Sequence, residues 1–189
     1  MSDTELKIIT RRNLAKHTHE TLEEQIIRDP LTGAFNRRFL DKKLDELTRN
    51  NRNETFALII FDIDHFKETN DTYGHLAGDG VLQEFVGILN SSIRVGVGDF
   101  VARYGGEEFA VVIKPTTDIE TAAEIAERVR DKVEKYEFRI PQGRSKATVS
   151  AGVGLWDQKE SKDKLIGRID TALYLAKNKY DRNNIKRAL

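Results

Sequence analysis

Two short apolar runs flank a turn with two glycines and two acidic residues, and this arrangement most limits how the chain can fold. The runs cover residues 100–102 and 109–113, and the turn contains Tyr104-Gly105-Gly106-Glu107-Glu108. Apolar runs on either side of a glycine turn predict a β-hairpin. We expect the two glycines to supply positive φ angles and to let the backbone approach a bulky anion closely.

A second acidic pair follows another apolar run. Residues 56–61 are typical of a buried strand, and Asp62 and Asp64 lie at its end. Acidic strand ends that meet in one sheet repel each other without a cation, and carboxylates are ligands that magnesium prefers. We therefore expect a magnesium–nucleotide site. Asp62 and Glu107 are the first-choice ligands, the Ile63 carbonyl is a third, and Asp64 is a secondary candidate.

The order of patterns along the chain predicts the fold class. The patterns, in order, are a helix after a cap at Asn36, a strand over 56–61, a helix over 81–93 that begins after Gly80, the hairpin, a helix opened by a capping box at 117–120, strands at 138–140 and 147–154, and a last helix over 165–176. This is the β-α-β-β-α-β plan of an α/β (α+β) fold. We expect a ferredoxin-like, mixed antiparallel sheet with helices mainly on one face.

The chain divides near residue 29. Residues 1–28 are highly charged with loosely helical apolar spacing, which favours a connecting or signalling helix, with a coiled coil or a frayed arm as alternatives. The turn at 29–33 contains proline and glycine and ends that helix. We expect residues 29–189 to form one catalytic domain.

The overall composition excludes several classes of protein. The 31 basic and 31 acidic residues cancel, which argues against a nucleic-acid substrate. The chain has no cysteine, so disulfides and thiolate metal sites are excluded. No apolar stretch approaches the length of about 18 residues that a membrane span needs. We therefore expect no membrane contact by this segment and a cytoplasmic location.

The hairpin turn resembles the signature loop of the GGDEF family in its GGEEF form, and the resemblance covers most of the chain. The further segments that carry it are residues 29–33, 36–38, 62–67, 70–75, 78–79, 150–153 and 172–177. The family's enzymes are diguanylate cyclases, which condense two GTP into cyclic di-GMP and release two pyrophosphates. The resemblance also implies a palm-type fold similar to that of polymerases and class III nucleotidyl cyclases.

Positions matched to the family imply roles for individual residues. Two Mg²⁺ ions per active site, with Mn²⁺ as an alternative, would be held by Asp62, the Ile63 carbonyl and Glu107. Glu107 would also act as the base toward the ribose 3′-hydroxyl, and Lys67 would be catalytic by neutralising phosphate charge. Substrate contacts would come from Phe66, Lys67, Asn70, His75, Asp79, Gly105, Gly106, Glu108, Lys177 and Arg182. Within this set, the Asn70 amide and the Asp79 carboxylate suit the donors and acceptor of guanine.

Two departures from the family pattern change what we expect. Asp99 occupies the acidic position of the family's Arg-x-x-Asp product-inhibition site, but Gly96 replaces the arginine, and Arg94 lies two residues away. We therefore expect weak or absent feedback inhibition. The second departure follows Lys177, where the family usually continues with two residues and then Gly-Arg-Asn. In this chain the glycine of that motif is missing, and its arginine, Arg182, is displaced by one position.

The resemblance implies a homodimer, because one half-site cannot close the cyclic product. An upstream sensor domain or protein would act through the N-terminal helix. The alternatives are a silent domain that senses GTP or cyclic di-GMP, and another palm-type nucleotidyltransferase.

Several residues also have ordinary structural interpretations. The lysines could be solvated surface residues, Asn70 could form an Asx turn, and Asp79 could cap a helix. Trp156 and Tyr174 are expected to be packing residues.

Overall fold

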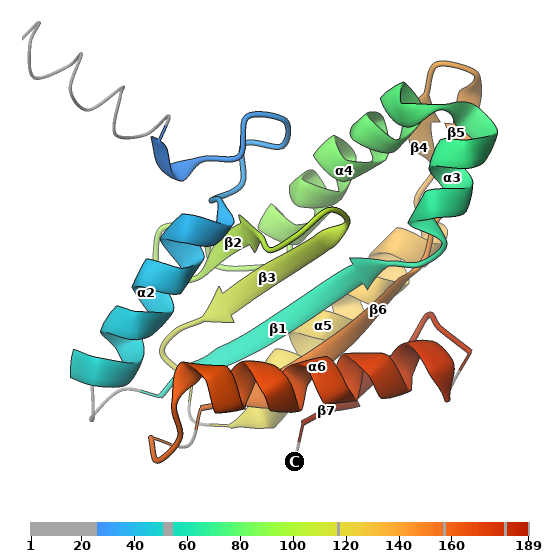
Figure 1. Cartoon of the computed structure of the whole chain (residues 1–189). Coiled ribbons are helices and arrows are strands. Elements are labelled where there is room, and N and C mark those ends of the chain that lie inside the picture. The colour runs from blue at the N-terminus through green and yellow to red at the C-terminus, as the bar shows by residue number, and fades with distance from the viewer. Residues whose placement is uncertain (1–25, 51–54, 117, 157, 180, 189) are drawn as a thin grey trace, which may run out of the picture.

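A five-stranded sheet forms the centre of the molecule, and helices cover both of its faces (Figure 1). The computed structural model describes residues 26–50, 55–116, 118–156, 158–179 and 181–188. The strand order is β2-β3-β1-β6-β7, and all neighbours are antiparallel except the parallel pair β6 and β7. The strands are β1 (Ala57–Ile63), β2 (Phe100–Arg103), β3 (Glu108–Ile113), β6 (Val149–Leu155) and β7 (Ile185–Arg187).

The helices connect these strands in the predicted order. They are α2 (Arg37–Asn50), α3 (Phe66–Tyr73), α4 (His75–Asn90), α5 (Ile119–Lys135) and α6 (Lys162–Asn178). A separate two-stranded sheet consists of β4 (Phe138–Ile140) and β5 (Gly143–Ser145). The β-α-β-β-α-β plan is confirmed, with α3 and α4 together in the place of the first helix.

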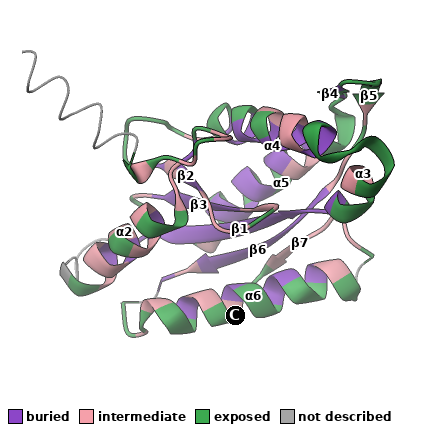
Figure 2. Ribbon diagram, turned by 45° about the horizontal axis from the view of Figure 1, so that its top comes forward, coloured by how far each residue is buried: buried purple, intermediate pink, exposed green. Residues whose placement is uncertain are grey.

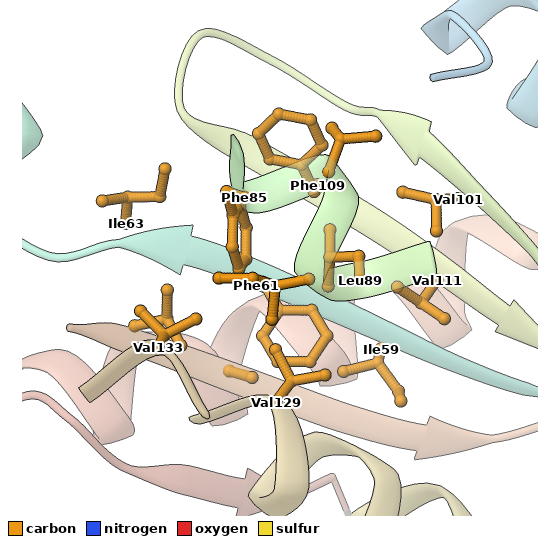
Figure 3. Packing of buried hydrophobic residues seen from close by; sticks show 14 of the residues in the cluster. Ile59, Phe61, Ile63, Phe85, Leu89, Val101, Phe109, Val111, Val129 and Val133 are labelled. Carbon is orange, nitrogen blue, oxygen red and sulfur yellow. The ribbon is translucent and has the colours of Figure 1, made fainter. Parts of the chain in front are cut away.

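The expectation that helices lie mainly on one face of the sheet is wrong, because every residue of β1 is buried. One set of alternating side chains, which includes Ile59 and Phe61, packs in a cluster with residues of α4 and α5 (Figure 3). The other set, Leu58 and Ile60, packs in a cluster with residues of α2 and α6. Figure 2 shows the buried sheet between these two helical layers. An apolar run without alternation is typical of a strand covered on both sides.

Close contact between α6 and the sheet depends on glycine. A methyl group on Gly152 of β6 would overlap the carbonyl of Ile169 in α6, and one on Gly154 would lie 2.6 Å from Ile169 Cγ1. Glycine therefore lets the helix backbone approach the strand. As a result Lys177, in the last turn of α6, reaches the end of β1 beside Asp62.

Two helix starts differ from the sequence-based expectation. Helix α4 begins at His75, directly after Gly74 with φ of 83°, instead of after Gly80. Asp79 therefore lies inside the helix and is not its cap. The cap of α5 is Asp118, whose carboxylate accepts a hydrogen bond from Thr121 N, and Thr117 lies outside the described residues. At α2 the cap is confirmed, since Phe39 N donates to Asn36 Oδ1 at 3.0 Å.

The predicted N-terminal helix falls almost entirely in residues 1–25, outside the described part of the chain. After the turn at 29–33 the chain meets β2 at Phe35, where Phe35 N donates to Val101 O and Arg103 N donates to Phe35 O. Among the helices that the structure describes, none combines the length and apolar character needed to cross a membrane.

Candidate functional site

Two acidic strand ends meet on the face of the sheet that α6 covers. Asp62 of β1 lies directly opposite Glu108 of β3 in the antiparallel register, and residues paired in this way project to the same face. Lys177 Nζ lies 2.9 Å from Asp62 Oδ1. Glu107 directly precedes Glu108 in the hairpin turn, and its carbonyl accepts a hydrogen bond from Ile63 N at 3.4 Å. The predicted meeting of the β1 end with the hairpin is therefore present.

The electrostatics of this cluster favour binding of a cation. Burial raises the pKa of Asp62, the Lys177 ammonium opposes that shift, and the charges of Glu107 and Asp64 add to it. Burial also raises the pKa of Glu108, and Asp62, Asp170 and Glu107 raise it further. Carboxyls whose pKa is raised by burial and by like charges mark a site that lacks positive charge.

The two glycines of the turn do not have the predicted positive φ angles, and that expectation is wrong. The turn is closed instead by main-chain hydrogen bonds from Tyr104 N and Gly105 N to Glu108 O, at 2.8 and 3.2 Å. A methyl group on Gly105 would lie 2.8 Å from Glu108 Oε2, whereas one on Gly106 would meet nothing within 4 Å. Gly105 therefore leaves room for the Glu108 side chain, and Gly106 leaves open space beside the turn.

Arg103 connects this turn to the start of the domain, a role that the sequence analysis missed. Its Nε and Nη2 donate to Gly106 O at 3.1 and 2.9 Å, and its Nη1 lies 3.1 Å from Asp29 Oδ1. Asp29 also accepts hydrogen bonds from the backbone N and the hydroxyl of Thr32. The guanidinium thus fixes the turn through its carbonyl.

Helices α3 and α4 carry the two residues that are predicted to read guanine. Asn70 lies inside α3, so the Asx-turn interpretation is wrong, and its amide lies against Gly78, which precedes Asp79 in α4. Phe66 is buried at the start of α3, whereas Lys67 and His75 are exposed. The lysine and the histidine are therefore accessible to a ligand.

Asp64 accepts three hydrogen bonds from other parts of the fold. Its carboxylate accepts hydrogen bonds from the hydroxyls of Thr148 and Ser150, at 2.8 and 2.9 Å, and from Asn183 N at 3.0 Å. These bonds join the end of β1 to β6 and to the C-terminal segment. The role of Asp64 as a secondary metal ligand stays a prediction, and a metal there would share the carboxylate with these three donors.

The residues at the end of β1 fit a magnesium ion that arrives with a phosphorylated ligand. Asp62 Oδ1 is buried and, apart from its ion pair, has no aligned hydrogen-bond donor among the described residues. No group of three or more acidic or histidine side chains in the described ranges converges closely enough to hold a metal alone. Magnesium is usually bound by one or two carboxylates together with substrate phosphates, which is the donor set that Asp62 and Glu107 provide.

Comparison with known proteins identifies the family. Residues 26–183 match the family model described as diguanylate cyclase, GGDEF domain. The chain belongs to the GGDEF family. It is 40% identical over 168 residues to the diguanylate cyclase DgcP of Pseudomonas aeruginosa, a match that covers 86% of this chain and 25% of DgcP. The chain thus spans a quarter of the length of that relative.

Solved structures of GGDEF proteins show the same fold. The coiled coil and GGDEF domain of DgcB from Caulobacter crescentus, in complex with c-di-GMP, superposes with a TM-score of 0.84 at 28% identity, and the match covers 99% of this chain and 100% of that one. The diguanylate cyclase SiaD of Pseudomonas aeruginosa, in complex with its activator SiaC, gives 0.82 at 33% identity, covering 98% and 72%. These likenesses confirm the predicted palm-type fold.

The structure describes the surroundings of Asp99 and of Arg182, where the sequence departs from the GGDEF pattern. The Asp99 carboxylate accepts hydrogen bonds from Arg94 Nε and Nη2, at 3.0 and 3.1 Å, and from Lys114 N at 2.9 Å. Arg94 therefore pairs with Asp99 across a loop in which Gly96 has φ of 88°. Arg182 lies in a run of three left-handed residues, 181–183, and its Nε is buried without a hydrogen-bond partner among the described residues.

The packing predictions for the two large aromatic residues have different outcomes. Trp156 is a packing residue, as predicted, because it is buried and stacks on Phe56 with ring centroids 5.3 Å apart. Tyr174 is 65% exposed, so its predicted packing role is wrong.

Proposed function

We propose that this GGDEF domain is a diguanylate cyclase, which joins two GTP molecules into cyclic di-GMP. The observation that carries the proposal is the cluster of Asp62, Glu108 and Lys177, in which two facing carboxylates meet one ammonium beside the glycine turn. Carboxylates and cations held at a water-accessible turn are what nucleotidyl transfer requires. The family and its named diguanylate cyclases support the same reaction.

The base of the nucleotide is assigned to Asn70 of α3 and Asp79 of α4, which lie on two helices in contact with each other. The Asn70 amide offers a donor and an acceptor, and the Asp79 carboxylate accepts from the ring N–H and exocyclic amine of guanine. Adenine presents a different pattern of donors and acceptors. This pair of side chains therefore selects GTP over ATP.

The phosphates are assigned to the glycine turn and the neighbouring cations. Gly106 leaves open space beside the turn, and the backbone N–H groups of Gly105 and Gly106, together with those of Phe66 and Lys67, are suitable donors to phosphate oxygens. Lys67 and Lys177 supply positive charge. His75, Glu108 and Arg182 are assigned as further substrate contacts.

In the reaction, the 3′-hydroxyl oxygen of each GTP forms a bond to the α-phosphorus of the other, and the bond from that phosphorus to pyrophosphate breaks. Glu107 accepts the hydroxyl proton. Two such steps close the ring and release two pyrophosphates. Asp62, Glu107 and the Ile63 carbonyl would hold magnesium, which when bound would activate the hydroxyl and neutralise charge on the leaving pyrophosphate, as in two-metal sites.

Ring closure requires two active sites that face each other, so we assign activity to a homodimer. The segment before residue 26 is the route by which an upstream sensor or an activating protein would set the dimer geometry. SiaD, a structural relative, is bound to an activator. A cytoplasmic location would give the domain access to GTP.

The test is to incubate the protein with GTP or ATP and Mg²⁺ and to identify the products by mass. Cyclic di-GMP from GTP, with no product from ATP, is the expected result, and the specific activity should rise with protein concentration where the dimer dissociates. GTP binding without product would indicate a silent sensor domain. Product from ATP would indicate another nucleotidyltransferase.

A further inference from the structure

The amide of Asn70 occupies the space that a side chain at residue 78 would fill. Gly78 is buried in α4, and a methyl group built on it would overlap Asn70 Oδ1. The same methyl would lie 3.0 Å from Asn70 Cγ and 3.0 Å from Phe66 Cζ. Two of the three nearest atoms therefore belong to the amide of Asn70.

The contact places Asn70 of α3 against the residue that precedes Asp79 in α4. Gly74 separates α3 from α4 and caps α3 through its N–H, which donates to Asn70 O at 2.8 Å. The sharp turn folds α3 back along α4, so the Asn70 side chain rests on the residue next to Asp79. A side chain at 78 would push the Asn70 amide out of this position.

We propose that Gly78 is a specificity-determining position, because its missing side chain seats the Asn70 amide beside Asp79. The inference rests on the proposed function, in which this pair reads guanine. Gly78 itself contacts no reacting atom, so it is a positioning residue. It acts through the orientation of Asn70.

The substitution Gly78→Ala should weaken guanine recognition while the protein stays folded. The overlapped atoms of Asn70 are the end of a flexible side chain, which can rotate away at little cost, and alanine favours the helix more than glycine does. The Phe66 ring, 3.0 Å from the new methyl group, has to shift by only a few tenths of an ångström. We therefore expect a melting temperature within about 4 °C of the parent protein. Asn70 then points away from its position beside Asp79.

Gly87 offers a matched control in the same helix. It is exposed, and a methyl group there would meet no neighbouring group within 4 Å. Gly87→Ala makes the same chemical change in α4 without touching Asn70. It should leave nucleotide binding as it is in the parent protein.

The experiment has two measurements on the full chain. The side-chain amide NMR signals of Asn70, recorded without nucleotide, should shift in Gly78→Ala and stay in place in Gly87→Ala. Binding of a nonhydrolysable GTP analogue with Mg²⁺ should weaken roughly tenfold in Gly78→Ala, because a hydrogen-bonding pair to the base is lost. The preference over the matching ATP analogue should fall by a similar factor.

A double-mutant cycle with Asn70→Ala distinguishes positioning from general damage. If Gly78 acts through Asn70, the variant that carries both Gly78→Ala and Asn70→Ala should bind the GTP analogue no more than about twofold more weakly than either single variant. Additive losses, unchanged guanine binding in Gly78→Ala, or a folding defect that Asn70→Ala does not relieve would overturn the proposal. Failure of the parent protein to bind the GTP analogue would instead overturn the proposed function, and this inference with it.

Discussion

The ammonium of Lys177 lies 2.9 Å from Oδ1 of Asp62, and it neutralises a carboxylate whose side chain is only 8% exposed. The close approach of α6 to β6 brings this cation to the end of β1. A divalent ion that binds Asp62 must displace the ammonium, because two cations cannot share one buried carboxylate oxygen without strong repulsion. Lys177 would then be free to reach phosphate oxygens.

Lys177→Met should destabilise the protein and change its response to metal. Asp62 would lose its counter-ion, so the free energy of unfolding should fall by about 1–3 kcal/mol, less than for a fully buried pair because Lys177 is partly exposed. Mg²⁺ added without nucleotide should then stabilise the variant more than the parent protein. Urea denaturation with and without Mg²⁺ measures both effects.

Lys162→Met is the control, because Lys162 lies on the same helix and pairs with Asp45 at 3.1 Å, far along α6 from the site. The two lysines are similarly exposed, but the partner Asp45 is 36% exposed against 8% for Asp62, so loss of this pair should change stability by less than about 1 kcal/mol. Its Mg²⁺ response should equal that of the parent protein. Equal Mg²⁺ responses in Lys177→Met and the parent protein would contradict competition between ammonium and metal.

Glu108→Gln should make the protein more stable at neutral pH. The pKa of Glu108 is raised in the fold, so the folded state binds the proton more tightly than the unfolded state, and stability falls as pH rises from the unfolded pKa through the folded one. The amide removes this cost. The gain should be present above the raised pKa and should vanish below about pH 4, where glutamate is protonated in both states.

Urea denaturation of Glu108→Gln and the parent protein at several pH values checks this prediction. A gain that persisted unchanged at low pH would show that charge is not its cause. Glu46→Gln is a suitable comparison, since the pKa of Glu46 is lowered by its hydrogen bond with Lys43. Its effect on stability should have the opposite sign at neutral pH.

The sequence predicted the elements that have strong apolar patterns. Buried apolar residues form continuous runs in β1 and β3 and one helical stripe in each of α5 and α6. These patterns are strong enough to be recognised in the sequence alone. Helix α3 was missed because Phe66 is its only buried residue. The three-residue strands β5 and β7 were missed because their partly polar sequences carry no alternation, and pairing with other segments determines them.

The site could be predicted in part, since acidic residues at strand ends are visible in the sequence. The facing pair of Asp62 and Glu108 depends on register, which the sequence does not specify by itself. The hydrogen bonds that occupy Asp64 come from residues more than 80 positions away. The ion pair between Arg103 and Asp29 likewise joins residues 74 positions apart.

Arg103→Ala should lower the turnover number about tenfold or more while the domain stays folded. The guanidinium holds the Gly106 carbonyl with two donors and pairs with Asp29, and a small displacement of positioning groups can cost up to about a hundredfold in rate. Arg103→Lys should retain part of the activity, because one ammonium cannot bridge both partners. Initial rates of cyclic di-GMP formation measure the effect.

Arg49→Ala controls for loss of an arginine, since Arg49 is 76% exposed and its pair with Asp45 spans 3.9 Å. Its rates should match those of the parent protein. Full turnover by a folded Arg103→Ala variant would show that the turn keeps its geometry without the hydrogen bonds and ion pair of Arg103.

Cyclic di-GMP should not inhibit the enzyme noncompetitively through Asp99. The Asp99 side chain is fully buried and already pairs with Arg94 and with Lys114 N, and Gly96 has no side chain with which to hold a phosphate. Asp99→Asn should therefore leave inhibition unchanged and lower the free energy of unfolding by about 1 kcal/mol, since it weakens the hydrogen bonds of a buried carboxylate whose partner Arg94 is 53% exposed. A cyclic di-GMP titration of turnover, with urea denaturation of the same variant, tests both. Tight noncompetitive inhibition that Asp99→Asn abolishes would show that the Arg94 pair opens to bind product.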